Sequence, residues 1–163
     1  MLNIRRARRA DCRSIAGVHA AAISAIDTTF YTAEEIRAWA VPKQPESYEA
    51  SIDSKEFFVA EEDDGVIVGF GVLNQESAEV EAVYVSPVAE RRGVGLGMLR
   101  TLEERARAYR LRMLRLSASL NAVPFYERAG YAAHEEAKHR LATGIEIACI
   151  RMTKVMASES DTG

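Results

Sequence analysis

Three glycines at alternate positions, Gly93, Gly95 and Gly97, constrain this fold more than any other feature of the sequence. They follow a stretch, 79–85, that predicts a β-strand, and they lead into leucines spaced as on one face of a helix. A glycine-rich loop between a strand and a helix leaves several backbone N–H groups bare at the positive end of the helix. The segment therefore predicts a binding site for an anion such as a pyrophosphate.

Two other glycine-rich phosphate sites do not fit this loop. A P-loop requires Lys and then Ser or Thr after its last glycine, whereas Met98 and Leu99 follow Gly97. A dinucleotide-binding loop has the spacing G-x-G-x-x-G directly after its strand, but residues 86–92 separate this strand from the first glycine. The sequence therefore disfavours an NTPase and a nicotinamide-dependent enzyme.

The loop resembles the acetyl-CoA motif of the GNAT superfamily of N-acetyltransferases, Gln/Arg-x-x-Gly-x-Gly/Ala, which residues 92–97 match as Arg-Gly-Val-Gly-Leu-Gly. Residues 120–131 resemble the second signature of that family, N-A-x-x-F-Y-x-x-x-G-F/Y. Both motifs stand in the family's order, and the resemblance covers residues 3–154. It implies an N-acetyltransferase that uses acetyl-CoA as cosubstrate and no metal.

The resemblance also implies a role for each motif residue. Backbone amides of 91–97 bind the pyrophosphate, and Gly95 leaves room for the close approach of phosphate. Residues 83–85 belong to a bulged strand that splays from its parallel neighbour and bonds the pantetheine arm. Asn121 caps the next helix or touches the cofactor, and capping is favoured. The cofactor-binding candidates are Val83, Tyr84, Val85, Arg91, Arg92, Gly93, Val94, Gly95, Leu96, Gly97, Asn121 and Tyr126.

Acetyl transfer to an amine needs a base, a hydrogen-bond donor to the thioester carbonyl and an acid for the leaving thiolate. Tyr126 is the candidate acid, because a phenol with a pKa of about 10 is protonated at neutral pH; the alternative is a core aromatic. Glu79 and Glu81, on one strand face, are the candidate bases. Glu79 matches the glutamate base of the histone-acetylating branch, and a solvated strand face with a water chain is the alternative. The amide of Val83 is the candidate donor.

The family selects its acceptor mainly through the first two helices and the loop before the last strand. Tyr31 and Trp39 are therefore candidate substrate-binding residues, although Trp39 could equally pack its helix on the sheet. The pattern Tyr-Thr-x-x-x-Ile-x-Ala-Trp, 31–39, resembles a poorly characterised bacterial subgroup of the family. This pattern does not identify the amine that accepts the acetyl group. A non-catalytic acyl-CoA-binding or interaction domain and transfer of a longer acyl chain remain alternatives, and a homodimer is possible by analogy.

Composition agrees with one soluble domain. The 163 residues are 48% hydrophobic and 28% charged, so residues 1–156 form one GNAT domain and 157–163 a disordered tail. A formal net charge of −3 gives no general attraction for nucleic acid or membrane. Cys12 and Cys149 stand in no zinc or disulfide pattern. Without a secretory h-region or a long apolar run, a cytoplasmic protein is expected.

The expected elements imply an α/β (α+β) GNAT fold: a central mixed, mostly antiparallel, twisted sheet of six to seven strands flanked by about four helices. Two helices have predicted caps: Asp11 for the first, and a Thr32–Glu35 capping box for the second. The strands are expected at 3–8, 57–60, 66–73, 79–85, 114–117 and 144–153. The predicted buried helix faces are Ile15, Val18, Ala22, Ile23 and Ile26, and Leu96, Leu99, Leu102 and Ala106.

Overall fold

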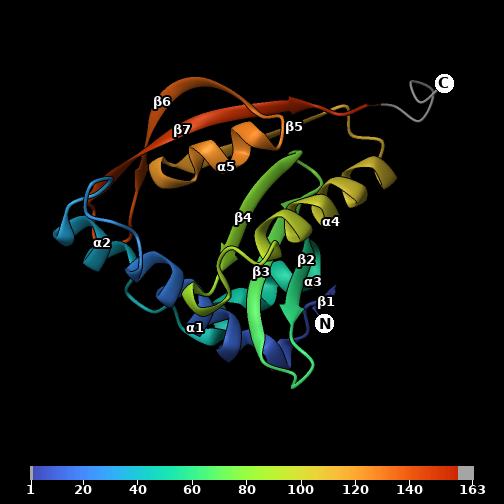
Figure 1. Cartoon of the computed structure of the whole chain (residues 1–163), viewed down its shortest axis with the longest axis horizontal. Helices are drawn as coiled ribbons and strands as arrows, with labels where there is room; N and C mark the ends of the chain where they lie inside the picture. Colours follow the sequence, from blue (N-terminus) through green and yellow to red (C-terminus); the bar gives the residue numbers. More distant parts are fainter. Residues whose placement is uncertain (1, 158–163) are drawn as a thin grey trace.

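A single mixed sheet organises residues 2–157, the part of the chain that the computed structural model describes. Its strand order is β1-β2-β3-β4-β5-β7-β6, and every neighbouring pair is antiparallel except β4 and β5 (Figure 1). The strands are β1 (Asn3–Arg6), β2 (Glu56–Glu61), β3 (Ile67–Asn74), β4 (Glu79–Val85), β5 (Met113–Ser119), β6 (Ala132–Arg140) and β7 (Glu146–Val155). The expected mixed, mostly antiparallel sheet is confirmed.

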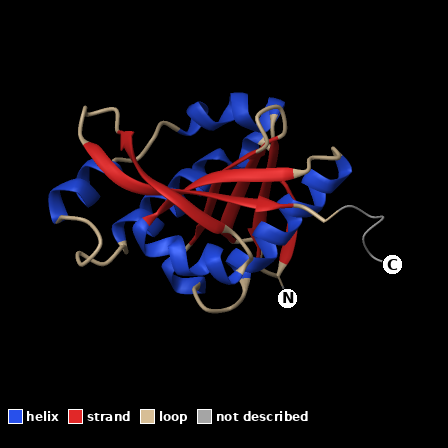
Figure 2. Ribbon diagram, turned by 90° about the horizontal axis from the view of Figure 1, so that it is seen from above, coloured by secondary structure: helices blue, strands red, loops and turns tan. Residues whose placement is uncertain are grey.

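Helices lie on both faces of the sheet (Figure 2). The α-helices of the described chain are α1 (Cys12–Ser24), α2 (Ala33–Trp39), α3 (Glu49–Ser54), α4 (Val94–Ala108) and α5 (Val123–Arg128). Alternate residues of β2 and β3 divide between two cores, one shared with α1 and one with α4. Within residues 2–157, none of the helices combines the length and the apolar character that crossing a membrane requires.

The start of α1 differs from the prediction. Asp11 ends a short 3-10 turn and makes no capping bond to α1. Its carboxylate accepts hydrogen bonds from the Arg5 guanidinium at 2.8 and 3.0 Å and from the Arg8 amide at 2.8 Å. These three donors hold the carboxylate against β1, so it cannot reach the first amides of the helix. The capping box of α2 is confirmed, since Thr32 Oγ1 accepts from Glu35 N and Glu35 Oε1 accepts from Thr32 N.

The predicted buried face of α1 is confirmed for Ile15, Val18 and Ile23, whereas Ala22 and Ile26 are half-buried. In α4, Leu99, Leu102 and Ala106 are buried as predicted, but Leu96 is 36% exposed. Leu96 lies at the edge of the buried face of α4. It is three residues before Leu99, which is less than one turn of about 3.6 residues, so its side chain is rotated away from the centre of that face. Val94 and Met98 fill the first turn of the stripe instead.

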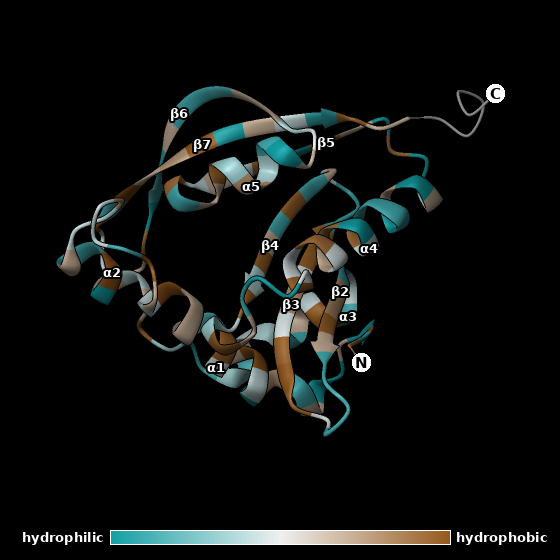
Figure 3. Cartoon of the chain, in the orientation of Figure 1, coloured by the Kyte–Doolittle hydropathy of each residue, from teal (hydrophilic) through white to brown (hydrophobic). Residues whose placement is uncertain are grey.

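Sequence patterning missed β6. Eight of its nine residues are exposed, so its burial does not alternate in the way that identifies a half-buried strand. β6 is an edge strand that pairs only with β7, and it is largely hydrophilic along its length (Figure 3). The predicted last strand, 144–153, corresponds to β7. The predicted disordered tail lies, from residue 158 on, outside the described residues.

Candidate active site

The parallel strands β4 and β5 separate soon after they meet. Their register holds a single pair, Glu79 opposite Arg115, and Arg115 N donates to Ala78 O at 3.0 Å. On its other edge β4 pairs with β3 along its whole length. A sheet that is continuous on one edge of β4 and open on the other exposes a row of main-chain groups. This is the splay that the family resemblance implies.

A β-bulge lies in β4 at Glu81. Leu73 pairs with Val80 and Val72 with Ala82, so Glu81 has no residue opposite it on β3. The bulge is therefore two residues before the 83–85 segment where the resemblance implies it. Beyond it, Ala82 packs on the α1 side of the sheet. Bulges are common beside active sites, and this one lies where Glu79 and Glu81 of β4 line the opening.

The hydrogen-bond phase of β4 decides which of its amides face β5. Ser86 N donates to Val68 O at 2.7 Å across the edge shared with β3. Because bonded and non-bonded residues alternate in an antiparallel pair, Tyr84 also bonds β3, whereas the amides of Val83 and Val85 point toward β5. The splay leaves these two amides without a strand partner among residues 2–157. Val83 thus has a main-chain amide that points toward the opening, and its role as carbonyl donor stays a prediction.

A cleft of about 240 Å³ occupies the opening between the strands. It brings together candidates that lie far apart in the sequence: Glu79 and Glu81 from β4, Tyr126 from α5, and Tyr31 and Trp39 from the α2 region. The full lining is Tyr31, Trp39, Glu79, Val80, Glu81, Ala82, Val83, Tyr84, Ser117, Ala118, Ser119, Ala122, Tyr126, His139, Ile147, Ala148 and Cys149. Val85, Asn121 and the 91–97 loop do not line this cleft.

Tyr126 is buried and still borders the cleft. Its ring packs edge-on against Phe125, with centroids 5.0 Å apart, and against Tyr131, at 5.7 Å. Burial raises the pKa of Tyr126 well above its usual value, so the phenol keeps its proton at neutral pH. Within residues 2–157 its hydroxyl has no hydrogen-bond partner. The group is therefore a proton donor with no partner of its own beside the cleft.

The two glutamates of β4 differ in how they are held. Glu81 accepts hydrogen bonds from Lys55 Nζ at 2.7 and 2.9 Å and from Asn74 Nδ2 at 3.0 Å. Glu79 is half-buried and makes no ion pair or hydrogen bond with another side chain in the described part of the chain. The Glu79 carboxylate is therefore free to contact a ligand in the cleft, whereas the Glu81 carboxylate is held by Lys55 and Asn74. On geometry alone Glu79 is the more accessible of the two candidates.

The loop before α4 has the backbone of an anion site. Arg91 and Gly93 have left-handed φ angles of +64° and +79°. The first helical hydrogen bond runs from Gly97 N to Gly93 O at 3.0 Å, so the preceding amides, 94–96, have no helical acceptor. A Cβ on Gly93 would meet no atom within 4 Å, which leaves open space beside these amides. Arg92 forms an ion pair with Glu62.

One expected role in the motifs needs correction, and one stays a prediction. A Cβ on Gly95 would lie 3.5 Å from Phe125 and 3.6 Å from Val85, which are ordinary van der Waals contacts, so the role of Gly95 beside phosphate stays a prediction. Asn121 does not cap α5: it lies in a 3-10 turn, its side chain is exposed, and the N-cap position is Ala122. Pro124 in the first turn removes one amide that a cap would serve.

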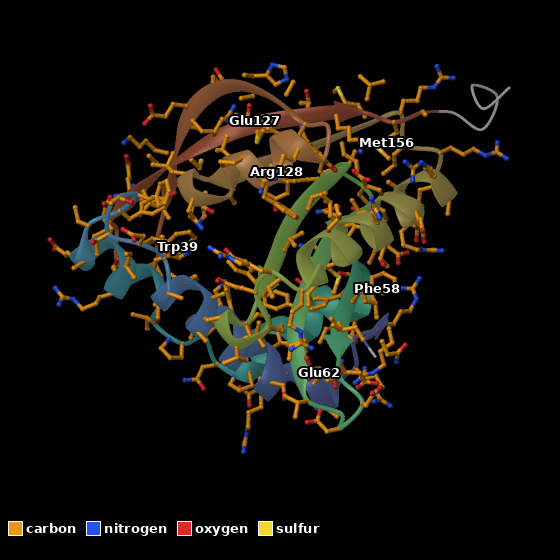
Figure 4. All side chains as sticks on the ribbon, in the orientation of Figure 1. Trp39, Phe58, Glu62, Glu127, Arg128 and Met156 are labelled. Atoms are coloured by element: carbon orange, nitrogen blue, oxygen red, sulfur yellow. The ribbon has the colours of Figure 1, made fainter. Side chains whose placement is uncertain are left out.

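Tyr31 and Trp39 form the opposite side of the cleft. The Tyr31 hydroxyl donates to Ala148 O at 2.6 Å and accepts from Leu120 N at 2.9 Å, so it joins β7 to the end of β5. The Trp39 ring lies edge-on to Tyr31 with centroids 5.4 Å apart, and it is half-buried at the end of α2 (Figure 4). Trp39 therefore both packs and borders the cleft. Tyr31 also borders the cleft, but its hydroxyl is already hydrogen-bonded to Ala148 O and Leu120 N.

Three further lining residues belong to no motif: Ser117 and Ser119 come from β5, and Ile147 comes from β7. Only the strand order, in which β7 lies between β5 and β6, could have indicated them. His139 of β6 also lines the cleft, and it begins the stretch before the last strand that the family resemblance links to acceptor selection.

The family profile described as Acetyltransferase (GNAT) domain matches residues 27–155. The chain belongs to the GNAT acetyltransferase family. A solved protein from Rhodopseudomonas palustris, described as a GCN5-related N-acetyltransferase and as a class-II aminotransferase, is 27% identical, with a TM-score of 0.87 over 94% of each chain. The PaiA N-acetyltransferase from Thermoplasma acidophilum, solved with coenzyme A, is 18% identical, with a TM-score of 0.76 over 95% of this chain and 99% of that one.

A curated relative of this GNAT chain is the uncharacterized protein YdhI of Bacillus subtilis. It is 26% identical over 82 residues, which are 48% of this chain and 51% of YdhI. The similarity thus spans about half the length of the relative.

Proposed function

We propose that this GNAT protein transfers the acetyl group of acetyl-CoA to a primary amine by direct attack in a ternary complex. The observation that carries the proposal is the splay between β4 and β5. It opens one cleft onto a main-chain donor at Val83, a protonated phenol at Tyr126 and a carboxylate without a cation at Glu79. These are the three groups that acetyl transfer to an amine requires.

The residues present fit acetyl-CoA in two places. The amides at 94–96 and the N-terminus of α4 suit the pyrophosphate, and the open space at Gly93 allows close approach. The Val85 amide, which points away from β3, suits a carbonyl of the pantetheine arm, and this arm can pair with β4 as a short extra strand. The coenzyme A complex of the Thermoplasma acidophilum protein, which shares this fold, supports the assignment.

Acetyl-CoA would supply the activated thioester, and the protein would handle protons and charge. The Val83 N–H donates a hydrogen bond to the carbonyl oxygen as negative charge develops there. Glu79 accepts the proton that the attacking amine loses, directly or through water. The C–N bond forms, the C–S bond breaks, and the Tyr126 O–H protonates the departing thiolate. Burial raises the pKa of Tyr126, so the phenol stays protonated at neutral pH and can hydrogen-bond the thiolate as its charge develops.

Amine-dependent release of free thiol from acetyl-CoA tests this function. We expect intersecting initial-rate plots and no acetylated protein when acetyl-CoA is present alone. Parallel plots with a mass increase of the protein would indicate a covalent intermediate and contradict direct transfer. Tight acetyl-CoA binding with no thiol release for any amine would favour the non-catalytic alternative. Faster turnover of butyryl-CoA than of acetyl-CoA would favour the longer-chain alternative.

We also propose that β6 pairs with a second copy of itself. It is an exposed edge strand, and such edges pair readily with other strands. Antiparallel pairing centred on Ala137 would place Glu136 opposite Lys138 and Glu135 opposite His139, which are complementary pairs. Sedimentation equilibrium with Lys138→Pro tests this: the bonded pair Leu141–Ile145 sets the hydrogen-bond alternation, which turns the amide of residue 138 to the free edge, and proline removes that donor. A monomeric parent protein would contradict it.

A further inference from the structure

The charges that line the cleft restrict the kind of amine that can enter it. We infer, on the basis of the proposed function, that the acceptor is a small alkyl- or arylalkylamine that carries no carboxylate. The cleft has two acidic side chains, Glu79 and Glu81, and no lysine or arginine lines it. A substrate that brings its own carboxylate would therefore meet like charge.

The negative charge of the two glutamates is only half compensated. Lys55 Nζ lies 2.7 Å from Glu81 and forms an ion pair with it. Lys55 is thereby engaged and does not itself line the cleft. Glu79 has no such partner within residues 2–157. The cleft thus attracts an ammonium group, which is the charged form of a primary amine at neutral pH.

A substrate carboxylate would find no cationic partner in this cleft. Burying a carboxylate is costly unless a positive group or several donors compensate it. His139 is the one lining side chain that can carry positive charge, and it lies on the exposed strand β6. Ser117 and Ser119 can offer neutral donors only. An amine with an uncharged body avoids this penalty altogether.

The wall opposite β4 suits an apolar body. Trp39 and Tyr31 meet edge-on there, and Ile147 lies beside them in the same apolar cluster. On the β4 side the Tyr84 ring stacks on Phe70 with centroids 5.5 Å apart. Aromatic surfaces of this kind bind aryl and alkyl groups and also tolerate a nearby ammonium. The acceptor shares a cleft of about 240 Å³ with the reactive end of acetyl-CoA, which favours a small body.

Three matched amines test the inference directly. Phenethylamine has no second functional group, phenylalaninamide adds a neutral carboxamide, and phenylalanine adds a carboxylate of almost the same size. Trp39 is the only tryptophan of the chain, so its fluorescence reports on binding in the cleft. Titrations would use the full chain saturated with coenzyme A, at a pH where all three amines are protonated.

We expect phenethylamine and phenylalaninamide to bind at least about tenfold more tightly than phenylalanine, because like charges in an interface are strongly unfavourable. Phenylalanine binding within about threefold of phenylalaninamide would overturn the inference. So would the absence of any fluorescence change for the three amines while coenzyme A binds normally. Failure of coenzyme A itself to bind would instead contradict the proposed function, so the two failures are distinguishable.

One pair of variants locates the discriminating charge. Glu79→Gln removes the unpartnered carboxylate and should reduce the phenylalaninamide-to-phenylalanine affinity ratio several-fold. Glu135→Gln is the control, because Glu135 is an exposed carboxylate on β6 that pairs with Arg151 and does not line the cleft. An equal ratio in the Glu79→Gln variant and the parent protein would overturn the electrostatic basis of the inference.

Discussion

The two walls of the cleft differ in how far apart in the chain their residues lie. The β4 wall comes from one continuous strand, and the loop that follows it leads directly into α4. The opposite wall joins Tyr31 to Ala148, 117 residues away, through a single hydrogen bond. In the proposed function the first wall contributes backbone amides and the Glu79 carboxylate, and the second contributes the side chains that meet the acceptor. We therefore expect substitutions in the β4 wall and α5 to affect chemistry, and those opposite to affect acceptor binding.

The largest effect should come from Tyr126→Phe. It removes the proton donor and keeps the ring that packs on Phe125 and Tyr131, so kcat should fall by about 10²–10⁴-fold with little change in the Kd for acetyl-CoA. A purely structural tyrosine would show the reverse pattern, a lower melting temperature with normal turnover. Measuring kcat, Kd and Tm on this one variant separates the two roles.

Glu79→Gln should follow, with a loss of about 10²-fold in kcat/KM and a changed acidic limb of the pH–rate profile. Its matched control is Glu81→Gln on the same strand, whose carboxylate is held by Lys55 and Asn74. We expect the control to retain most of the rate and the shape of the profile. Identical pH profiles for the parent and both variants would show that water alone takes the proton.

In the opposite wall, Tyr31→Phe leaves Ala148 O and Leu120 N without their partner. Unsatisfied buried groups cost about 1–3 kcal/mol, which a chemical denaturation curve would detect. The KM for the amine should rise while the Kd for acetyl-CoA stays nearly constant. Tyr48→Phe is the control, because its hydroxyl contacts His19 and neither of these residues lines the cleft. Equal changes in amine KM for both variants would contradict a role for this wall in acceptor binding.

Gly71→Ala should have the smallest effect on activity, because its effect is purely structural. A Cβ on Gly71 would lie 2.6 Å from Met98 Cγ, so α4 or Met98 must shift, at a cost of about 1–3 kcal/mol in the free energy of unfolding. Gly17→Ala in α1 is the control, because a Cβ there meets nothing within 4 Å and alanine favours helix. A stable Gly71→Ala protein would show that the packing of α4 on β3 adapts easily.

The difference between the walls also explains what the sequence could predict. The strand, loop and helix of 79–108 could be predicted because each has a local signal: apolar residues, glycines and a leucine spacing. The phenol of α5 could be predicted from the second family motif, and the carboxylates of β4 from strand alternation and the match of Glu79 to the base of one branch of the family. The structure places all three in one cleft. Local signals are sufficient where function depends on a continuous segment.

The remaining features depend on tertiary context. β6 has exposed residues on both faces, so no pattern distinguishes it from a loop. Asp11 has the residue type of a helix cap, but Arg5 on β1 binds its carboxylate and only the folded chain brings β1 there. The bulge at Glu81 depends on the register with β3. His139 and Ile147 reach the cleft only because β7 lies between β5 and β6.

The central claim is that the main chain of β4, opened by the splay, binds the cofactor. Hydrogen exchange of assigned backbone amides, measured by NMR with and without coenzyme A, tests it most directly. We expect slower exchange on binding at Val83 and Val85 and in the 94–96 loop amides, with no change in the exposed edge of β6. Unchanged exchange at Val83 and Val85 in a protein saturated with coenzyme A would contradict the claim.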